Sequence, residues 1–452
     1  MKKKSIKKKA ISAEDKSIIS DYFQSKNSKN IKAFTDELLT NMGKKLEPFV
    51  KFDDISTTNM VYENINDNNM ALHIGQRKLL MNEIQFLTIQ AKTKVKYCIY
   101  AGSAPGNKTY LLSQLFPDIK FILIDPNIFN LVINEFTNHR TVKNPNIIHI
   151  YSDYTYEGNS YGKNKKIKEM TASEKKDLVN FISESNYKLF IIEDYMTNII
   201  AELLASLNCT FISDIRSNAL QGITISDFDI VWNTSMMFNW INILKPDLSV
   251  FKFRIPFYNA GVMDFTKHKD IYGDTFEVSK KFGIDFIKNY NAKKFYLTNS
   301  VIYLQPWASR GSTEMRSIIY KKDIINQNII IYNTKEIENK LFSFNVVSRI
   351  LYHKNSNADK ELNFCNCNDC AIENTIWVNY FKLKIKQNIA PTIKDAVIIA
   401  GKVTHRPLTR VHTNNVWGPI KNLNQYKEMY TKVNNSTYYN NTGSQKGERG
   451  IG

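Results

Sequence analysis

Residues 100–106 read Tyr-Ala-Gly-Ser-Ala-Pro-Gly, and their neighbours on either side decide the fold. The apolar run Tyr97–Ala101 leads into the two glycines, and the amphipathic run Lys108–Leu115 follows them. Gly102 and Gly106 allow a backbone to come close to a ligand, and the start of the next helix offers free N–H groups. A strand, a glycine loop and a helix in this order indicate an α/β domain.

The rest of the chain continues this pattern. From about residue 75, apolar runs of strand length alternate with helical runs, which is typical of a parallel sheet with crossover helices. Two later apolar runs follow each other without a long helix and are expected to close the sheet as antiparallel partners. We therefore predict a Rossmann-like α/β fold. The expected strands are Tyr97–Ala101, Phe121–Asp125, Leu189–Ile192, Thr210–Asp214, Leu248–Phe253, Ile302–Trp307 and Met315–Tyr320, and the expected helices are Lys108–Leu115, Asn198–Leu207 and Ile225–Leu244.

Composition divides the chain into three parts. We expect a basic tail with a lead-in helix near residues 36–42 over 1–54, the main domain over 55–350, and an extension with a frayed end over 351–452. Within the main domain, the polar stretch 152–188 is expected to be a surface insertion. No run approaches the roughly 20 apolar residues of a membrane span, so no membrane partner is expected.

The charge of the chain favours a polyanionic partner. Lys and Arg outnumber Asp and Glu by 61 to 43, which gives a net charge of +18. Such an excess favours nucleic acid as the partner. The alternative is a lysine- and asparagine-rich chain in which the charge is only a solvated surface.

Asp125 is expected at the end of the strand that follows the glycine loop. In such folds an acid at this position accepts hydrogen bonds from ribose hydroxyls. The loop itself is not GxGxxG, and it lacks the Lys-Ser/Thr ending of a P-loop. Loop and acid together predict an adenosine-containing ligand, and the alternative is a tight turn with a helix-capping aspartate.

Four further strings each set a charged residue in an apolar setting at a strand end or a helix start. Burying a charge is costly unless it is paired, so the four strings together predict an ionic cluster. They are Gln76-Arg77-Lys78-Leu79-Leu80, Ile212-Ser213-Asp214-Ile215-Arg216, Phe251-Lys252-Phe253-Arg254-Ile255-Pro256-Phe257 and Ser312-Thr313-Glu314-Met315-Arg316.

Taken in order with the glycine loop, Asp125 and the string Leu-Gln-Pro-Trp at 304–307, these motifs resemble the poxvirus cap-specific mRNA nucleoside-2′-O-methyltransferases. These FtsJ-like proteins also serve as the small subunit of poly(A) polymerase. The resemblance covers about residues 60–350. It implies S-adenosyl-L-methionine as cofactor, the cap-proximal ribose 2′-hydroxyl of 7-methylguanosine-capped mRNA as methyl acceptor, and a poly(A) polymerase catalytic subunit as a further partner. It also implies a viral source and a place in the host cytoplasm, in the viral factory or the virion.

The resemblance assigns the chemistry to a Lys-Asp-Lys-Glu quartet, with Lys252 as the candidate base. A lysine of ordinary pKa, about 10.4, is protonated at neutral pH, so we expect burial and the neighbouring Lys78 to lower the pKa of Lys252. The two carboxylates are expected to orient the lysines. The quartet is Lys78, Asp214, Lys252 and Glu314.

The same resemblance implies cofactor contacts, among which Asn127 stands where the family has an arginine. Either the strand ending near Ser152 or the strand with Ile192 lines the adenine, and we favour Ile192. The expected cofactor residues are Gln76, Tyr100, Gly102, Ser103, Gly106, Asp125, Asn127 and Ile192.

A 7-methylguanine base is cationic and stacks well between aromatic faces. The resemblance places Tyr62 and Phe257 on its two sides and Glu338 at its edge, while Asn259 replaces an expected acid. For Tyr62, an ordinary packed tyrosine is the alternative. The cap and the first nucleotides are expected to be contacted by Tyr62, Arg254, Ile255, Pro256, Phe257, Asn259, Ser312, Thr313 and Glu338.

The chain has five cysteines, and Cys365, Cys367 and Cys370 are crowded together. An odd number in this arrangement is a poor disulfide framework and favours an intracellular protein. Zinc needs four ligands, and His353 would be the fourth. Because the paired Cys-x-x-Cys spacing is incomplete, we expect reduced thiols and no metal, with structural zinc as the alternative.

Two other functions compete with cap methylation. The first is a non-catalytic RNA-binding subunit of a viral poly(A) polymerase, and an intact quartet argues against this as the sole role. The second is 2′-O-methylation of uncapped ribosomal or transfer RNA. Tyr62, Phe257 and Glu338 argue against it, because an uncapped substrate needs no aromatic cage.

Overall fold

The computed structural model describes most of residues 50–345. It covers 50–55, 61–62 and 72–345, except 92, 132, 134–138, 140–143, 151–158, 163–164, 222–224, 273–289, 306–307, 309–310 and 327–328, and it also covers 376, 379–380 and 383. The lead-in helix expected near 36–42, His353 and the cysteine cluster lie outside these residues.

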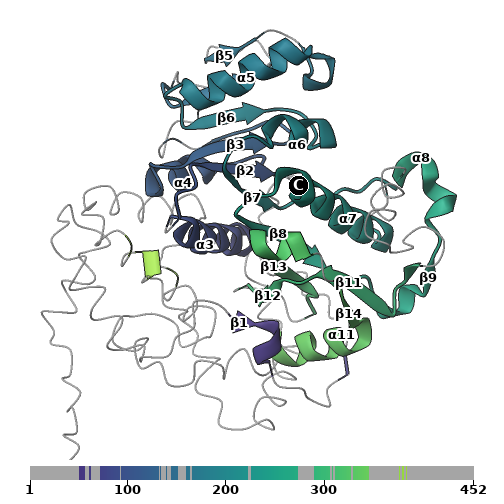
Figure 1. Cartoon of the computed structure of the whole chain (residues 1–452). Coiled ribbons are helices and arrows are strands. Elements are labelled where there is room, and N and C mark those ends of the chain that lie inside the picture. Colours follow the sequence, from purple (N-terminus) through teal and green to yellow (C-terminus); the bar gives the residue numbers. More distant parts are fainter. Residues whose placement is uncertain are drawn as a thin grey trace, which may run out of the picture.

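A sheet of ten strands in the order β1-β12-β13-β8-β7-β2-β3-β6-β4-β5 forms the centre of the described chain (Figure 1). The strands from β8 to β5 run parallel, whereas β13, β12 and β1 pair antiparallel. The strands are β1 (Val50–Lys51), β2 (Tyr97–Ala101), β3 (Lys120–Ile124), β4 (Ile147–Ile150), β5 (Ser160–Tyr161), β6 (Leu189–Ile192), β7 (Cys209–Ser213), β8 (Leu248–Arg254), β12 (Val301–Leu304) and β13 (Glu314–Tyr320).

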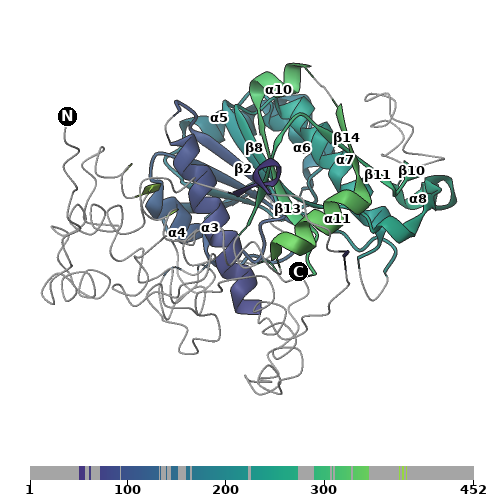
Figure 2. The same cartoon turned by 90° about the horizontal axis from the view of Figure 1, so that it is seen from below.

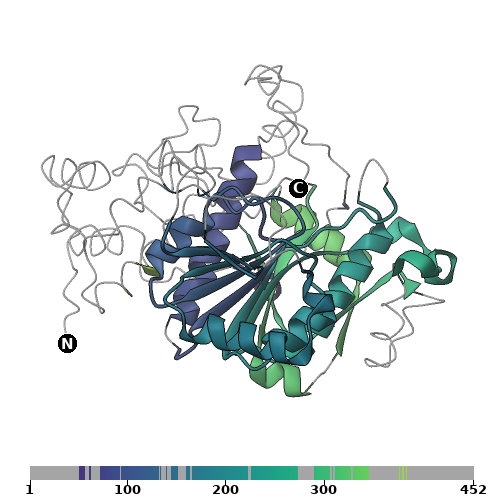
Figure 3. The ribbon, with the colours of Figure 1, turned by 90° about the horizontal axis from the view of Figure 1, so that it is seen from above.

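Helices cover both faces of this sheet. Figures 2 and 3 show α3 and α4 on one face and α5, α6 and α7 on the other. Two small antiparallel pairs, β9 with β10 and β11 with β14, lie beside the main sheet. The bounds are α3 (Leu72–Gln90), α4 (Thr109–Leu115), α5 (Ala172–Glu184), α6 (Asn198–Leu204), α7 (Asp227–Leu244), α8 (Lys269–Tyr272), α10 (Lys321–Asn326), α11 (Thr334–Ser343), β9 (Val262–Met263), β10 (Tyr290–Asn291), β11 (Lys294–Thr298) and β14 (Ile329–Asn333).

The strand sequences follow from this double cover. β6 and β7 are buried at every position, and so are all but the first residues of β2 and β3. Strands covered on both faces read as continuous apolar runs instead of alternating ones. This is why the apolar runs located the sheet: β2 and β6 have the expected bounds, and the other expected strands agree within one to three residues. Among the described helices, none is long and apolar enough to cross a membrane.

The stretch 152–188, expected to be a surface insertion, contains a helix whose place could not be read from the sequence. It contains α5, which begins with a capping box in which Thr171 and Glu174 each bond the other's backbone N–H. The apolar side chains Leu178 and Ile182 then bury one face of the helix against the sheet. Few apolar residues in a lysine-rich stretch had concealed an amphipathic helix.

The order of the strands reverses at β2. The chain passes from β2 to β3 on one side and later returns to β7 on the other side. In open parallel sheets, ligands bind outside the carboxyl ends of the strands at such a reversal. The glycine loop that follows β2 therefore lies at the expected ligand crevice.

Gly102 allows the two strand ends at this crevice to pack closely. Its φ is +74°, and a Cβ at this position would lie 2.8 Å from Ile215 N and 3.0 Å from Asp214 C. The Asp214 N–H also donates to Ala101 O at 3.0 Å. The ends of β2 and β7 thus meet backbone against backbone, and only glycine fits between them.

We expect Gly102→Ala to cost more stability than Gly261→Ala, a matched control whose φ is +69° and whose Cβ position has no atom of the described residues within 4 Å. The unfavourable φ costs each variant about 1–3 kcal/mol. Overpacking adds a further ~1–3 kcal/mol at Gly102 alone. Denaturant unfolding of the three proteins measures both losses, and equal losses would contradict the close packing of β2 and β7.

Candidate active site

The pairing of β8 with β13 gathers charges on one face of the sheet. Arg316 lies opposite Lys252, and Glu314 lies opposite Arg254. Residues that face each other across two strands share a face, as do alternate residues along one strand. All four side chains therefore emerge on the same face, where three cations need carboxylate partners.

The predicted quartet comes together at this place. Lys252 Nζ lies 3.6 Å from both Asp214 Oδ1 and Glu314 Oε2. Lys78, which reaches over from α3, donates from Nζ to Glu314 Oε1 at 2.8 Å. The four side chains keep only 12–19% of their exposure, so they are enclosed but open to one side.

Two further side chains close the quartet into a ring. Arg316 donates from NH1 to Asp214 at 2.7 Å and from Nε to Gln305 Oε1 at 3.0 Å. Gln305 in turn donates from Nε2 to Glu314 at 2.7 Å. We call Lys78, Asp214, Lys252, Gln305, Glu314 and Arg316 the Lys252 cluster. The short bonds of both carboxylates go to residues other than Lys252, whose ammonium is held at longer range.

The environment lowers the pKa of Lys252. Burial is the largest cause, and the cations Arg216 and Arg316 lower the pKa further, while Asp214 and Glu314 oppose the shift. These two arginines, rather than the expected Lys78, are the largest positive influences on this pKa. Lys78 is instead bound by Glu314.

The two carboxylates remain ionised. Burial alone would raise their pKa values, yet the nearby cations lower the pKa of Asp214 and bring that of Glu314 well below its usual range. Lys252 is the largest of these influences on both acids. The Lys252 cluster thus combines two ionised carboxylates with a lysine whose pKa is below its usual value.

Asp125 organises the glycine loop. Its Oδ2 accepts the Ala104 N–H at 3.1 Å, and its Oδ1 accepts both the backbone and the side-chain N–H of Asn127 at 2.9 Å. The Asp125 N–H donates to Ile192 O at 3.2 Å, which places Ile192 at the end of the neighbouring strand. Asn127 therefore supports Asp125 in the place where an arginine was expected.

The remaining predicted cofactor residues surround the same loop. The hydroxyl of Tyr100 donates to Glu83 on α3, and the buried Ser103 Oγ has no hydrogen-bond partner in the part of the chain that the structure describes. Gly106 has a φ of +66° and packs against Leu131 and Phe129. Gln76 lies on α3 two residues before Lys78, and its side chain is outside the description.

The structure also brings Tyr62 and Phe257 together. Their ring centroids are 6.3 Å apart at an interplanar angle of 41°, and Phe342 packs edge-on against Tyr62 at 5.8 Å. Tyr62 is fixed by its hydroxyl, which donates to Gly311 O at 3.0 Å. The guanidinium of Arg254 lies 5.2 Å from the centre of the Phe257 ring.

Carboxylates border this aromatic pair. Glu338 on α11 accepts the Tyr258 N–H at 2.9 Å, and burial raises its pKa, as does the nearby Asp227. Asp227 accepts the Phe257 N–H at 3.3 Å. Asn259 is exposed. Glu338 was expected to be alone at this edge, so Asp227 is an acid that the sequence analysis missed.

The other predicted RNA residues form the walls of the site. Ile255 and Pro256 are buried, and Thr313 is 4% exposed. Ser312 accepts the Glu314 N–H at 3.1 Å through its Oγ, and thereby holds the start of β13.

The sequence analysis gave no role to Arg216, Gln305 or Arg316. Arg316 and Arg254 follow Glu314 and Lys252 by two positions, which is the strand period. That period was a signal that they share a face with the quartet. Gln305 had no such signal, because its contact depends on how β12 pairs with β13.

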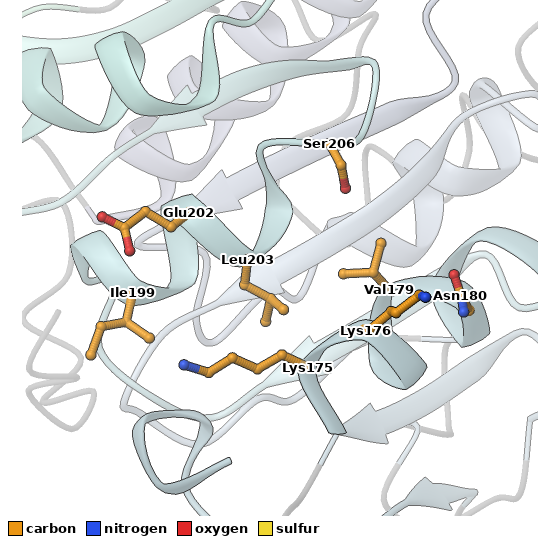
Figure 4. Close-up of a pocket in the computed structure, with 8 residues that line it drawn as sticks. All are labelled: Lys175, Lys176, Val179, Asn180, Ile199, Glu202, Leu203 and Ser206. Carbon is orange, nitrogen blue, oxygen red and sulfur yellow. The ribbon is translucent and has the colours of Figure 1, made fainter. Parts of the chain in front are cut away.

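A separate pocket of about 440 Å³ lies between α5 and α6 (Figure 4). Its lining residues, among them Lys175, Ile199 and Glu202, come from these helices and from the turn after α6. None of the predicted site residues lines it, so it is not part of the candidate active site.

Two comparisons with known proteins bear on this arrangement. The sequence model of the family described as "Poly A polymerase regulatory subunit" matches residues 44–156, which contain Tyr62, Lys78 and the glycine loop. The "Cap-specific mRNA (nucleoside-2'-O-)-methyltransferase" of fowlpox virus (strain NVSL) is 27% identical over 208 residues, 44% of this chain. The chain spans about half of that relative, 52% of its length. The chain is therefore similar over residues 44–156 to the poly A polymerase regulatory subunit family, and over 208 residues to a viral cap-specific mRNA 2′-O-methyltransferase.

Proposed function

We propose that the chain transfers a methyl group from S-adenosylmethionine to the ribose 2′-hydroxyl of the cap-proximal nucleotide of 7-methylguanosine-capped mRNA. The observation that carries this proposal is the Lys252 cluster, which lies beside the glycine loop at the carboxyl edge of the parallel strands. The similarity to the fowlpox virus cap-specific mRNA (nucleoside-2'-O-)-methyltransferase supports the same reaction.

The residues around the glycine loop fit an adenosyl cofactor. The strand order reverses between β2 and β7, as in doubly wound nucleotide-binding sheets, and Asp125 ends the strand next to the loop. Ser103 Oγ and Asn107 Oδ1 are buried in the loop and have no hydrogen-bond partner among the described residues, so they have capacity for a polar ligand. Bound S-adenosylmethionine would supply an electrophilic methyl group. Asp125, Ile192 and the loop would hold it.

Lys252 is the residue that we expect to remove the proton of the 2′-hydroxyl. A hydroxyl is a weak nucleophile until a base takes its proton, and a base works best when its pKa lies near the operating pH. Burial and the cations Arg216 and Arg316 lower the pKa of Lys252 in this direction. Asp214 and Glu314 keep the amine in place through contacts of 3.6 Å. Contacts of this length leave Lys252 Nζ able to form a hydrogen bond with the substrate hydroxyl.

The pair of Tyr62 and Phe257 supports recognition of the methylated cap. A flat base between two rings needs centroids about 7 Å apart, because each stacking contact is about 3.5 Å. The observed separation is 6.3 Å at 41°, so a small opening and rotation of the rings would admit the base. Glu338 and Asp227 place negative charge beside the pair, which suits a cationic base.

A second role beside a poly(A) polymerase catalytic subunit is supported by the family match over residues 44–156. The net charge of +18 suits a protein that holds RNA for a polymerase. Methyl transfer and polymerase binding do not exclude each other, because an intact Lys252 cluster serves only the first.

We expect labelled methyl groups to enter a short RNA with a 7-methylguanosine cap, but not the same RNA with an unmethylated cap or without a cap. Stacking on a cationic base is worth about 1–3 kcal/mol per ring. Phe257→Ala should therefore reduce the discrimination between the three RNAs roughly tenfold or more, read as the ratio of kcat/KM values.

The neighbouring Tyr258→Ala serves as the control, because Tyr258 contacts Lys293 and Lys335 and gives Glu338 only its backbone N–H. It should keep the cap preference. Label that enters all three RNAs equally in the wild-type protein would contradict cap recognition.

We expect Arg216→Gln to move the pH dependence of methyl transfer. Arg216 lowers the pKa of Lys252, so its removal raises that pKa, and the neutral amine then forms only at higher pH. The acidic limb of the kcat profile should shift upward by on the order of one pH unit. Arg216→Lys keeps the cation and should keep the wild-type profile. An unchanged profile in Arg216→Gln would show that Arg216 does not act on the titrating group.

A further inference from the structure

A buried ion pair under the glycine loop plays no part in the mechanism above. Lys108, directly before α4, and Glu83 on α3 lie 3.0 Å apart from Nζ to Oε1, and their side chains are only 7% and 4% exposed. The Tyr100 hydroxyl donates to the same Glu83 oxygen. Oε1 of Glu83 thus contacts both Lys108 and Tyr100.

The pair has hydrogen-bonding capacity that the described residues do not use. Glu83 Oε2 has no hydrogen-bond partner among the described residues, and the Lys108 ammonium has three N–H groups with Glu83 as its charged neighbour. Ser103 Oγ and Asn107 Oδ1, also buried and unpartnered, lie in the same loop. Buried polar atoms without partners are costly, and their grouping around one loop indicates a place where a polar ligand completes them.

The position of the pair relative to the Lys252 cluster restricts which part of a ligand it can bind. Tyr100, which bonds Glu83, directly precedes Ala101, and Ala101 O accepts the Asp214 N–H at 3.0 Å, so the pair lies close to both the glycine loop and the Lys252 cluster. We propose that Lys108 and Glu83 form the subsite for the amino-acid end of S-adenosylmethionine, with Lys108 binding the α-carboxylate and Glu83 Oε2 binding the α-ammonium. This inference rests on the proposed function.

The chemistry of the two ends matches. The amino-acid end is a zwitterion, and a fixed cation beside a fixed anion binds it with charge-assisted hydrogen bonds on both groups. Burial lowers the pKa of Lys108 and raises that of Glu83, so each charge gains from an additional partner of opposite sign. The alternative is that the pair only connects α3 to the loop and does not contact the ligand. In that case the pair would not distinguish a ligand with the amino-acid end from one without it.

The test compares two nucleosides by calorimetry on the full chain. S-adenosylhomocysteine carries the amino-acid end, and 5′-methylthioadenosine has the same adenosine and sulfur without it. Lys108→Met should weaken binding of the first about ten- to a hundredfold, the value of a hydrogen bond to a charged group. It should change binding of the second less than about twofold, and Lys108→Arg should recover part of the loss.

Lys120→Met is the control, because Lys120 also makes several bonds, to the carbonyls of Ile182, Ser183 and Ser185, but lies away from the loop. It should leave the ratio of the two affinities unchanged. If Lys108→Met unfolds, Glu83→Gln keeps the shape and should lower the same ratio. Equal losses for both nucleosides, or no loss, would overturn the subsite. Failure of the wild-type protein to bind either nucleoside would overturn the proposed function as well.

Discussion

The site depends on the burial of Lys252 and on how that burial is compensated. A lone buried ammonium is costly, and here Asp214 and Glu314 offset the cost. Both acids are held by other residues through bonds of 2.7–2.8 Å, whereas Lys252 lies at 3.6 Å from each. The anions therefore stay fixed and ionised while the lysine keeps freedom to exchange a proton. Lys78, Gln305 and Arg316 are the residues that bond the two carboxylates at short range.

A single strand connects the two halves of the site. β8 carries Lys252 and Arg254 on one face, and Phe257 follows three residues later. Arg254 contacts the Phe257 ring, and both are tied to Asp227 at the start of α7. The spacing between Lys252 and the aromatic pair is thus set by the backbone, which suits the proposed substrate, whose cap and first ribose must be placed together.

Much of this arrangement was predictable from the sequence, because continuous apolar runs located the parallel strands and the motifs located the quartet at their ends. Lys78, Asp214, Lys252 and Glu314 do meet, as do Tyr62 and Phe257. The supporting contacts were not predictable. Gln305 reaches Glu314 because β12 pairs with β13, and Asp227 reaches Phe257 from the start of α7. Neither contact can be read from a local sequence pattern. The helix α5 was missed because its capping box stood among lysines.

The central claim is that Lys252 accepts the proton, and Lys252→Arg tests it most directly. Arginine keeps the positive charge but cannot lose its proton near neutral pH. We expect methyl transfer to capped RNA to fall at least about a hundredfold, the usual contribution of a general base, while binding of S-adenosylhomocysteine stays nearly unchanged. Lys321→Arg, at an exposed ion pair with Asp247, should keep full activity. Methyl transfer by Lys252→Arg at a rate near that of the wild type would show that Lys252 only steers the hydroxyl.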